Sequence, residues 1–289
     1  LISLLRINNC TKIKLLTSTH EHHGAIRSFA NNPMFEVFYI EDSFLNNEKE
    51  FEVCIKRIKP DICFFSQITW DKFETIPVKM LFSLSKKYFP KIINILDCAQ
   101  TLGLYPIEKS NADLIVSSAH KWLFGPQGTG FMWIKKSFLD VLPPFHYGEV
   151  IDANNPASQF EDSGGYSYFL FHGLFEALCL FEKVGQELIL SKSIKLAEYL
   201  NNLIEDMKFN EKFKLELKGP VLNLNWLDTK NNLPYEIYKS LNESNISLKY
   251  IKIFERKLNR YRIGVPYFES KERLHKVVKT LEDLLFKFQ

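Results

Sequence analysis

The sequence predicts an α/β protein with a mostly parallel sheet that has helices on both faces, followed by a smaller C-terminal α+β domain. Through roughly residue 150, short apolar runs alternate with amphipathic stretches, which is typical of strands joined by crossover helices. Further along, a long apolar helix leads into a region without that alternation. We therefore expect a large domain over residues 1–180 and a small domain over residues 181–289.

The large domain contains six apolar runs of strand length. In order they are TKIKLLTS (11–18), FEVFYI (35–40), DICFFSQ (61–67), IINILD (92–97), ADLIVSS (112–118) and GTGFMWI (128–134). Residues 47–58 and 76–89 carry apolar residues three and four apart, which predicts crossover helices. Polar residues directly follow several strands. Because the carboxyl ends of parallel strands meet at one edge of a sheet, we expect a ligand site at that edge.

The small domain follows the apolar helix predicted at residues 164–185. Another helix is expected at residues 193–207, and residues 213–226 have a strand-like pattern on either side of a Gly-Pro pair. An amphipathic helix over residues 271–288 closes the chain. This mixture predicts a small α+β domain.

Composition argues against several classes of function. Lys and Arg number 37 against 34 Asp and Glu, so the net charge of +3 gives no nucleic-acid footprint. No apolar run reaches the roughly 18 residues that a membrane span needs. We expect a cytoplasmic protein with reduced thiols and no metal, because the cysteines lack metal-ligand spacing: Cys10, Cys54, Cys63, Cys98 and Cys179. The chain starts at Leu1 without Met, and we expect that its natural beginning is missing.

The segment SSAHKWLFGPQGTG (117–130) places Lys121 after a buried-type strand and before three glycines. Glycines let the backbone turn tightly and approach another group closely. A partly desolvated lysine has a lowered pKa, so its amine becomes available as a nucleophile for a Schiff base. A solvated His-Lys pair on the surface is the plainer alternative.

Asp97 ends the apolar run IINIL, where an unpaired carboxylate would be costly. One interpretation is a helix N-cap. The other is a cationic partner, and the pyridinium nitrogen of pyridoxal 5′-phosphate (PLP) is a group that such an aspartate can pair with. Gln100 lies three residues further on, at the same strand-to-helix turn.

Four segments together resemble the class V aminotransferase-like family of PLP enzymes of fold type I. They are THEHHGAIRSF (19–29), ILDCAQTLGLYPIE (95–108), ADLIVSSAHKWLFGPQGTGFMW (112–133) and RYRIGVPYFESKERLHKVVKTLEDL (260–284). The resemblance covers nearly the whole chain. It implies that the large domain is the cofactor-binding domain of that fold, and that the protein is a homodimer.

The resemblance also implies roles for individual residues. Lys121 would hold PLP as a Schiff base and move protons at the substrate α-carbon. Asp97 would keep the pyridine nitrogen protonated, and Gln100 would bond the phenolic oxygen. His22 would stack on the ring, with His23 as the alternative.

The remaining implied contacts are to phosphate and substrate. Ser118 and His120 would contact the phosphate, and Arg262 would clamp the substrate carboxylate with its planar fork. Arg262 could instead be one of several surface arginines. Where the family has a Gly-Thr pair that contacts the phosphate across a dimer interface, this sequence has FEDSGGYSY (160–168), and Ser163 could replace the threonine hydroxyl.

Two features separate this chain from the cysteine desulfurases of the family. Those enzymes need a nucleophilic cysteine near the C-terminal arginine, whereas no cysteine follows Cys179. Gln67 and Trp70, in SQITW (66–70), resemble the branch that contains isopenicillin N epimerase-like proteins. We expect both side chains to bind substrate, with core packing as the alternative for Trp70.

The sequence therefore predicts a PLP-dependent enzyme that acts at the α-carbon of an amino acid. Aminotransferase, epimerase and carbon–sulfur lyase chemistry all fit. The competing hypothesis is a degenerate family member, without catalysis, that serves as a dimeric binding protein.

Overall fold

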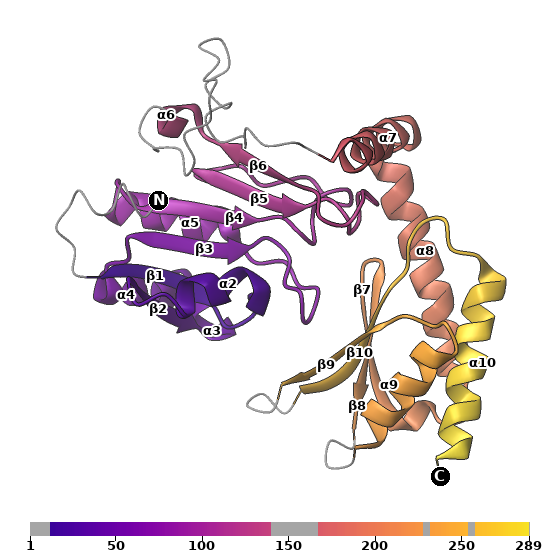
Figure 1. The fold of residues 1–289 in the computed structure, drawn as a ribbon. Helices are drawn as coiled ribbons and strands as arrows, with labels where there is room; N and C mark the ends of the chain where they lie inside the picture. Colours follow the sequence, from indigo (N-terminus) through magenta and orange to yellow (C-terminus); the bar gives the residue numbers. More distant parts are fainter. Residues whose placement is uncertain (1–11, 140–166, 228–231, 254–257, 289) are drawn as a thin grey trace. The chain divides into compact units, whose positions relative to one another are not determined.

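The computed structural model describes residues 12–139, 167–227, 232–253 and 258–288. The chain divides into two compact units. The first comprises residues 1–70 and 75–181, and the second comprises residues 71–74 and 182–289. Each unit has its own sheet (Figure 1).

Strands and helices alternate through most of the first unit. Its elements are β1 (Ile13–Ser18), α2 (His23–Ala30), β2 (Phe35–Ile40), α3 (Asp42–Leu45), α4 (Glu48–Ile58), β3 (Ile62–Ser66), α5 (Val78–Tyr88), β4 (Ile93–Asp97), β5 (Leu114–Ser118), β6 (Gly130–Ile134), α6 (Lys136–Leu139) and α7 (Tyr168–Val184), of which the last three residues fall in the second unit.

The first sheet has six strands in the order β2-β1-β3-β4-β5-β6. Neighbouring strands are parallel except β6, which runs antiparallel to β5. The six predicted strands and the mostly parallel sheet are confirmed. The sequence pattern did not reveal the reversed direction of β6.

Both faces of this sheet are covered. Helices α4 and α5 pack on one face, where Phe51 and Phe82 meet strand residues such as Phe65. Helix α2 covers the other face through Ile26, which packs near Phe64. The near-continuous apolar strands follow from burial on both sides.

Helix α4 illustrates how local sequence sets element ends. The Asn47 side chain accepts hydrogen bonds from the backbone N–H groups of Lys49 and Glu50, which caps the helix start. The helix ends where Lys59 takes a left-handed conformation (φ 51°), directly before Pro60.

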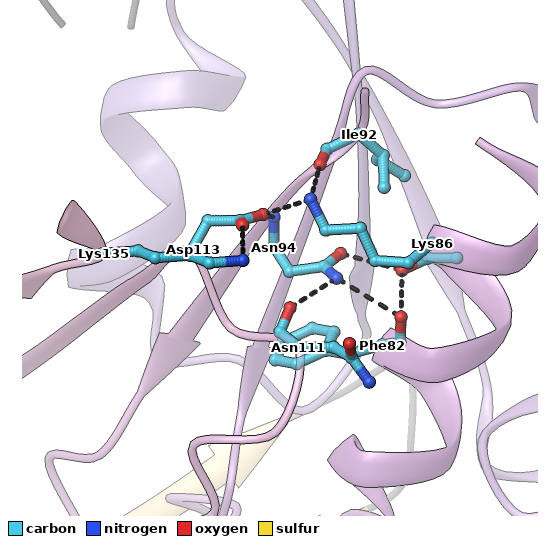
Figure 2. A network of polar contacts seen from close by, with 8 residues as sticks. Phe82, Lys86, Ile92, Asn94, Asn111, Asp113 and Lys135 are labelled. Carbon is cyan, nitrogen blue, oxygen red and sulfur yellow. Dashed lines mark hydrogen bonds and ion pairs between the residues drawn. The ribbon is translucent and has the colours of Figure 1, made fainter. Parts of the chain in front are cut away.

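A buried polar network ties together the amino ends of β4 and β5 (Figure 2). The fully buried carboxylate of Asp113 lies 2.6 Å from the Lys86 ammonium and accepts the Asn94 backbone N–H at 2.9 Å. The Asn94 side chain in turn donates to the Asn111 carbonyl at 2.8 Å. Because a buried carboxylate needs such partners, the network fixes this end of the sheet.

The second unit has a four-stranded antiparallel sheet, in the order β7-β8-β10-β9. Its elements are α8 (Gln186–Glu205), the 3₁₀ helix η2 (Asn210–Lys212), β7 (Phe213–Lys218), β8 (Val221–Trp226), α9 (Leu233–Glu243), β9 (Lys249–Ile253), β10 (Leu258–Gly264) and α10 (Lys271–Lys287). Helices α8, α9 and α10 supply apolar residues to one core with this sheet. The predicted C-terminal α+β region is confirmed, although α9, β9 and β10 were not predicted individually.

None of the helices within the described residues is long and apolar enough to cross a membrane.

Candidate active site

A pocket of about 640 Å³ lies at the carboxyl ends of the central strands in the first unit. It brings together five of the residues selected from the sequence: His22, Asp97, Ser118, His120 and Lys121. Its remaining wall is largely apolar and includes Phe131 and Met132 of β6. An apolar pocket with a few convergent polar groups is the usual form of a cofactor site.

Asp97 is the last residue of β4, between Ser66 of β3 and Val116 of β5. Burial raises the pKa of Asp97, while the Ala99 N–H, which donates to its carboxylate at 2.7 Å, and the nearby Lys121 charge lower it. The helix N-cap alternative is wrong, because residues 98–113 form turns and contain no helix, and the Ala99 bond closes one of these turns. The same carboxylate also lines the pocket and lies within the electrostatic reach of Lys121.

Lys121 lies in a tight turn between β5 and β6. The Ala119 N–H donates to the Thr129 carbonyl at 3.0 Å, and the Gly125 N–H donates to the Ala119 carbonyl at 2.9 Å. Gly103 packs against this turn from the segment after β4. A Cβ atom on Gly103 would lie 2.6 Å from the Trp122 carbonyl oxygen, so the close approach requires glycine there.

Ser118 tests whether these residues suit a phosphate-bearing cofactor. Within the described part of the chain, its hydroxyl oxygen is buried and has no hydrogen-bond partner. A buried polar atom in a native site calls for a partner that a ligand can supply. Together, this hydroxyl, the Lys121 amine and the Asp97 carboxylate line one pocket and fit the donor and acceptor set of PLP.

His22 caps helix α2, because its Nδ1 accepts the Gly24 N–H at 3.1 Å. Its ring lies edge-on to Trp70 at 5.1 Å between centroids and next to His23 at 4.3 Å. His22 lines the pocket, and Trp70 therefore buttresses one of its walls.

Glu21 is a buried residue of this region to which the sequence reasoning gave no role of its own. Ser18 donates to its carboxylate at 2.7 Å, and both the Ser66 hydroxyl and the Ser66 N–H also donate to it. Burial, supplemented by the negative charge of Asp97, raises the pKa of Glu21 to about 7 in spite of these hydrogen bonds. Its signal in the sequence was its position between a strand end and His22.

The two predicted glutamines do not line the pocket. Gln67 is buried and spans a loop, since its Nε2 donates to the Pro106 carbonyl at 2.8 Å and its Oε1 accepts the Glu108 N–H at 3.0 Å. The Gln100 Oε1 accepts the indole N–H of Trp122 at 3.3 Å. Both amides thus position loops around the site.

Arg262 belongs to the second unit, on β10. It is half-buried, and burial lowers its pKa to about 10, with attraction to Asp71 opposing the shift. Its neighbour Arg260 is buried. Ser163 lies outside the described residues.

A family model for class V aminotransferases matches residues 5–250 of this chain. Two curated relatives are probable cysteine desulfurases. The protein from Ureaplasma parvum is 26% identical over 136 residues, which cover 43% of this chain and 34% of the relative. The protein from Pyrococcus abyssi is 28% identical over 127 residues, covering 40% and 31%. Each match thus spans about a third of the relative's length.

Solved structures share the fold. A cystine C–S lyase in complex with cysteine persulfide superposes with a TM-score of 0.77 at 17% identity, covering 94% of this chain and 76% of that chain. A cysteine desulfurase from Thermococcus onnurineus gives 0.77 at 19% identity, covering 99% and 76%. A ureidoglycine-glyoxylate aminotransferase from Bacillus subtilis gives 0.74 at 16% identity, covering 99% and 76%.

These comparisons correct one prediction. Gln67 and Trp70 had suggested the isopenicillin N epimerase-like branch, but the two curated relatives are probable cysteine desulfurases. In the structure Gln67 braces a loop and Trp70 packs on His22. The family model covers most of the sequence, and the chain belongs to the class V aminotransferase family, whose members use PLP.

Proposed function

We propose that this protein is a PLP-dependent enzyme that acts at the α-carbon of an amino acid, with Lys121 as its central catalytic residue. The observation that supports this most directly is the shared pocket of Asp97 and Lys121, whose charges attract each other. A cofactor ring between an amine and a carboxylate needs both groups at one sheet edge. Their placement at the end of β4 and on the loop after β5 meets that requirement.

Each pocket residue has a proposed task in holding the cofactor. The Lys121 amine would bind it covalently, and the Asp97 carboxylate would accept a hydrogen bond from its ring nitrogen. Ser118 and His120 would bind its phosphate, and His22 would pack on its ring. When bound, PLP supplies an electron sink for negative charge that forms at the substrate α-carbon.

The remaining chemistry belongs to the protein's own side chains. Lys121, once its amine is released, would take a proton from the substrate α-carbon and return it. Asp97 would stay ionised against a cationic partner, although burial alone favours its neutral form. Phe131 and Met132 would limit the access of water to the reacting carbon. Arg262 would bind the substrate carboxylate.

We favour aminotransferase or carbon–sulfur lyase chemistry over cysteine desulfurase chemistry. A desulfurase passes sulfur to a thiolate near the C-terminal arginine, and no cysteine follows Cys179 in this sequence. The lyase and the aminotransferase among the structural relatives make both reaction types reasonable starting points.

Cofactor uptake tests this proposal. We expect purified protein mixed with PLP to develop a visible absorption band that Lys121→Ala abolishes, because the substitution removes the only proposed covalent attachment point. Lys109→Ala, at an exposed site, should leave the band unchanged. Borohydride reduction followed by peptide mass spectrometry should place the cofactor on the peptide that contains Lys121.

A label on another lysine would refute the assignment of Lys121. If the protein took up no PLP at all, the alternative of a non-catalytic binding protein would replace the enzyme proposal.

A further inference from the structure

One face of the second unit's sheet concentrates polar side chains. Arg260 and Arg262 alternate on β10 and therefore project to the same face, opposite Asn225 and Asn223 of β8. The Cα atoms of the two arginines are two positions apart, or roughly 7 Å along the strand. Such a pair repels, and one carboxylate near both would offset that repulsion.

The short segment Asp71–Glu74, here termed the strap, supplies that carboxylate. The strap is bound from three strands. Arg260 donates to the Asp71 carbonyl at 3.1 Å, Asn223 donates to the Lys72 carbonyl at 3.0 Å, and Lys218 lies 3.3 Å from the Glu74 carboxylate.

We propose that Asp71 is a positioning residue that orients Arg262 for the carboxylate of the substrate, an inference that rests on the proposed function. Asp71 is completely buried, and its carboxylate accepts the Lys72 N–H at 2.9 Å. A buried carboxylate is retained at low cost only when cations face it. Arg260 and Arg262 are the cations that do so here.

The two arginines divide their tasks. Arg260 is buried and bonds the main chain of the strap, so it holds the strap in place. Arg262 is less buried, and it interacts electrostatically with the Asp71 carboxylate. A guanidinium has five N–H donors in a flat fork. One edge can face Asp71 while the other binds an incoming carboxylate, and the first contact fixes the plane of the second.

The first test uses the PLP-loaded protein with L-alanine as the probe and ethylamine as a probe that lacks the carboxylate. Asp71→Asn keeps the shape and removes the charge. We expect Asp71→Asn to raise the half-saturating concentration of L-alanine about tenfold, which corresponds to the loss of one charge-assisted contact. The change in visible absorbance on adding L-alanine measures this concentration. The response to ethylamine should not change. Glu74→Gln, on the same strap, should behave as wild type, because the Glu74–Lys218 ion pair is exposed and contributes little to holding the strap.

A double-mutant cycle of Asp71→Asn with Arg262→Lys separates a positioning role of Asp71 from a general disturbance of the fold. Asp71→Asn should add little in that background, because the fork it orients is gone. An effect of Asp71→Asn equal to that of Glu74→Gln, equal for both probes, or undiminished with Arg262→Lys would overturn the proposal.

A second test does not depend on the cofactor. In nitrogen-15 spectra of the protein without added PLP, we expect a slowly exchanging Arg262 Nε–H signal, assigned by its loss in Arg262→Lys. Asp71→Asn should broaden or remove it, whereas Glu74→Gln should not. If that signal persisted in Asp71→Asn, the positioning role would be refuted. This readout stays decisive even if PLP uptake fails and the proposed function falls.

Discussion

Glu21 shows at the scale of one residue how position controls protonation. Its carboxylate lies between the ends of β1 and β3 and accepts hydrogen bonds from Ser18 and Ser66. Those bonds favour the ionised form, yet loss of hydration outweighs them and raises the pKa from 4.5 to about 7. The group therefore titrates near neutral pH at the edge of the candidate site.

This raised pKa predicts a pH-dependent stability. Between pH 4.5 and about 7 the folded state keeps a proton on Glu21 that the unfolded state releases, so stability falls as pH rises through this window. The difference amounts to roughly 3 kcal/mol at 1.36 kcal/mol per pKa unit. Urea unfolding should show this loss in the wild type and a smaller loss, by that amount, in Glu21→Gln.

Glu36→Gln provides the control, because Glu36 is an exposed carboxylate on β2. Its pH profile should match that of the wild type. Identical profiles for Glu21→Gln and wild type would show that Glu21 is ionised across the whole range.

Individual site residues differ in how far the sequence predicted them. Lys121 was recognisable because three glycines follow it, and Asp97 because it ends an apolar strand, and the structure shows that both line one pocket. The partners of Gln67 could not be predicted, because an amide gives no local sign of which distant loop it will bond. The importance of Glu21 and Asp71 arises from burial, which only the folded chain creates.

At the scale of elements, the turn after β5 depends on backbone packing. Gly103 has φ 93° and lies against the Trp122 carbonyl, next to Lys121. Gly128 lies in the β5–β6 connection itself and has a similar φ of 88°. A Cβ atom on Gly128 would come no closer than 3.8 Å to Leu170. An alanine at Gly128 would therefore meet only backbone strain, whereas an alanine at Gly103 would meet both backbone strain and a steric clash.

Alanine substitutions should reveal that difference. We expect Gly128→Ala to lower the free energy of unfolding by about 1 kcal/mol, the cost of a left-handed alanine. Gly103→Ala should cost about 3 kcal/mol, because the strand-to-turn packing must also shift. It should weaken PLP uptake as well. Chemical denaturation and absorbance titration measure both effects, and equal losses for the two variants would contradict this account.

Strand and helix positions were predictable because periodicity and capping are local. The apolar runs became β1 to β6, and Asn47 begins α4 as a cap should. The antiparallel direction of β6 was not predictable in this way. Direction depends on how the β5–β6 connection folds back, and a five-residue strand has the same pattern in either direction.

At the scale of the whole molecule, α7 presents a broad apolar surface. Its exposed large side chains are Tyr168, Phe169, Phe171, Phe175, Leu178 and Leu180. Phe171, Phe175 and Leu178 are spaced four and three residues apart, so they share one side of the helix, and an exposed apolar stripe of this kind marks an interaction site. The family resemblance predicts a homodimer, and we assign this helix to the predicted interface.

The cytoplasmic location of the protein stays a prediction.

A double substitution tests the dimer. Phe171→Glu with Phe175→Glu places two charges on the same side of α7, in the predicted contact, so we expect light scattering after gel filtration to change from a dimer mass to a monomer mass. Val53→Glu, at an exposed apolar position on α4, should leave the dimer intact. A monomeric wild type, or a dimeric double variant, would contradict the assignment.

The distribution of thiols makes it possible to measure unfolding of one unit separately from the other. Cys54, Cys63 and Cys98 are buried in the first unit, and burial raises the pKa of Cys98 to about 12, so alkylating reagents cannot react with them in the native fold. No cysteine occurs among residues 182–289. With Cys10 and Cys179 replaced by serine, the rate of maleimide incorporation reports unfolding of the first unit alone. Unfolding of the second unit exposes no thiol and leaves this rate unchanged.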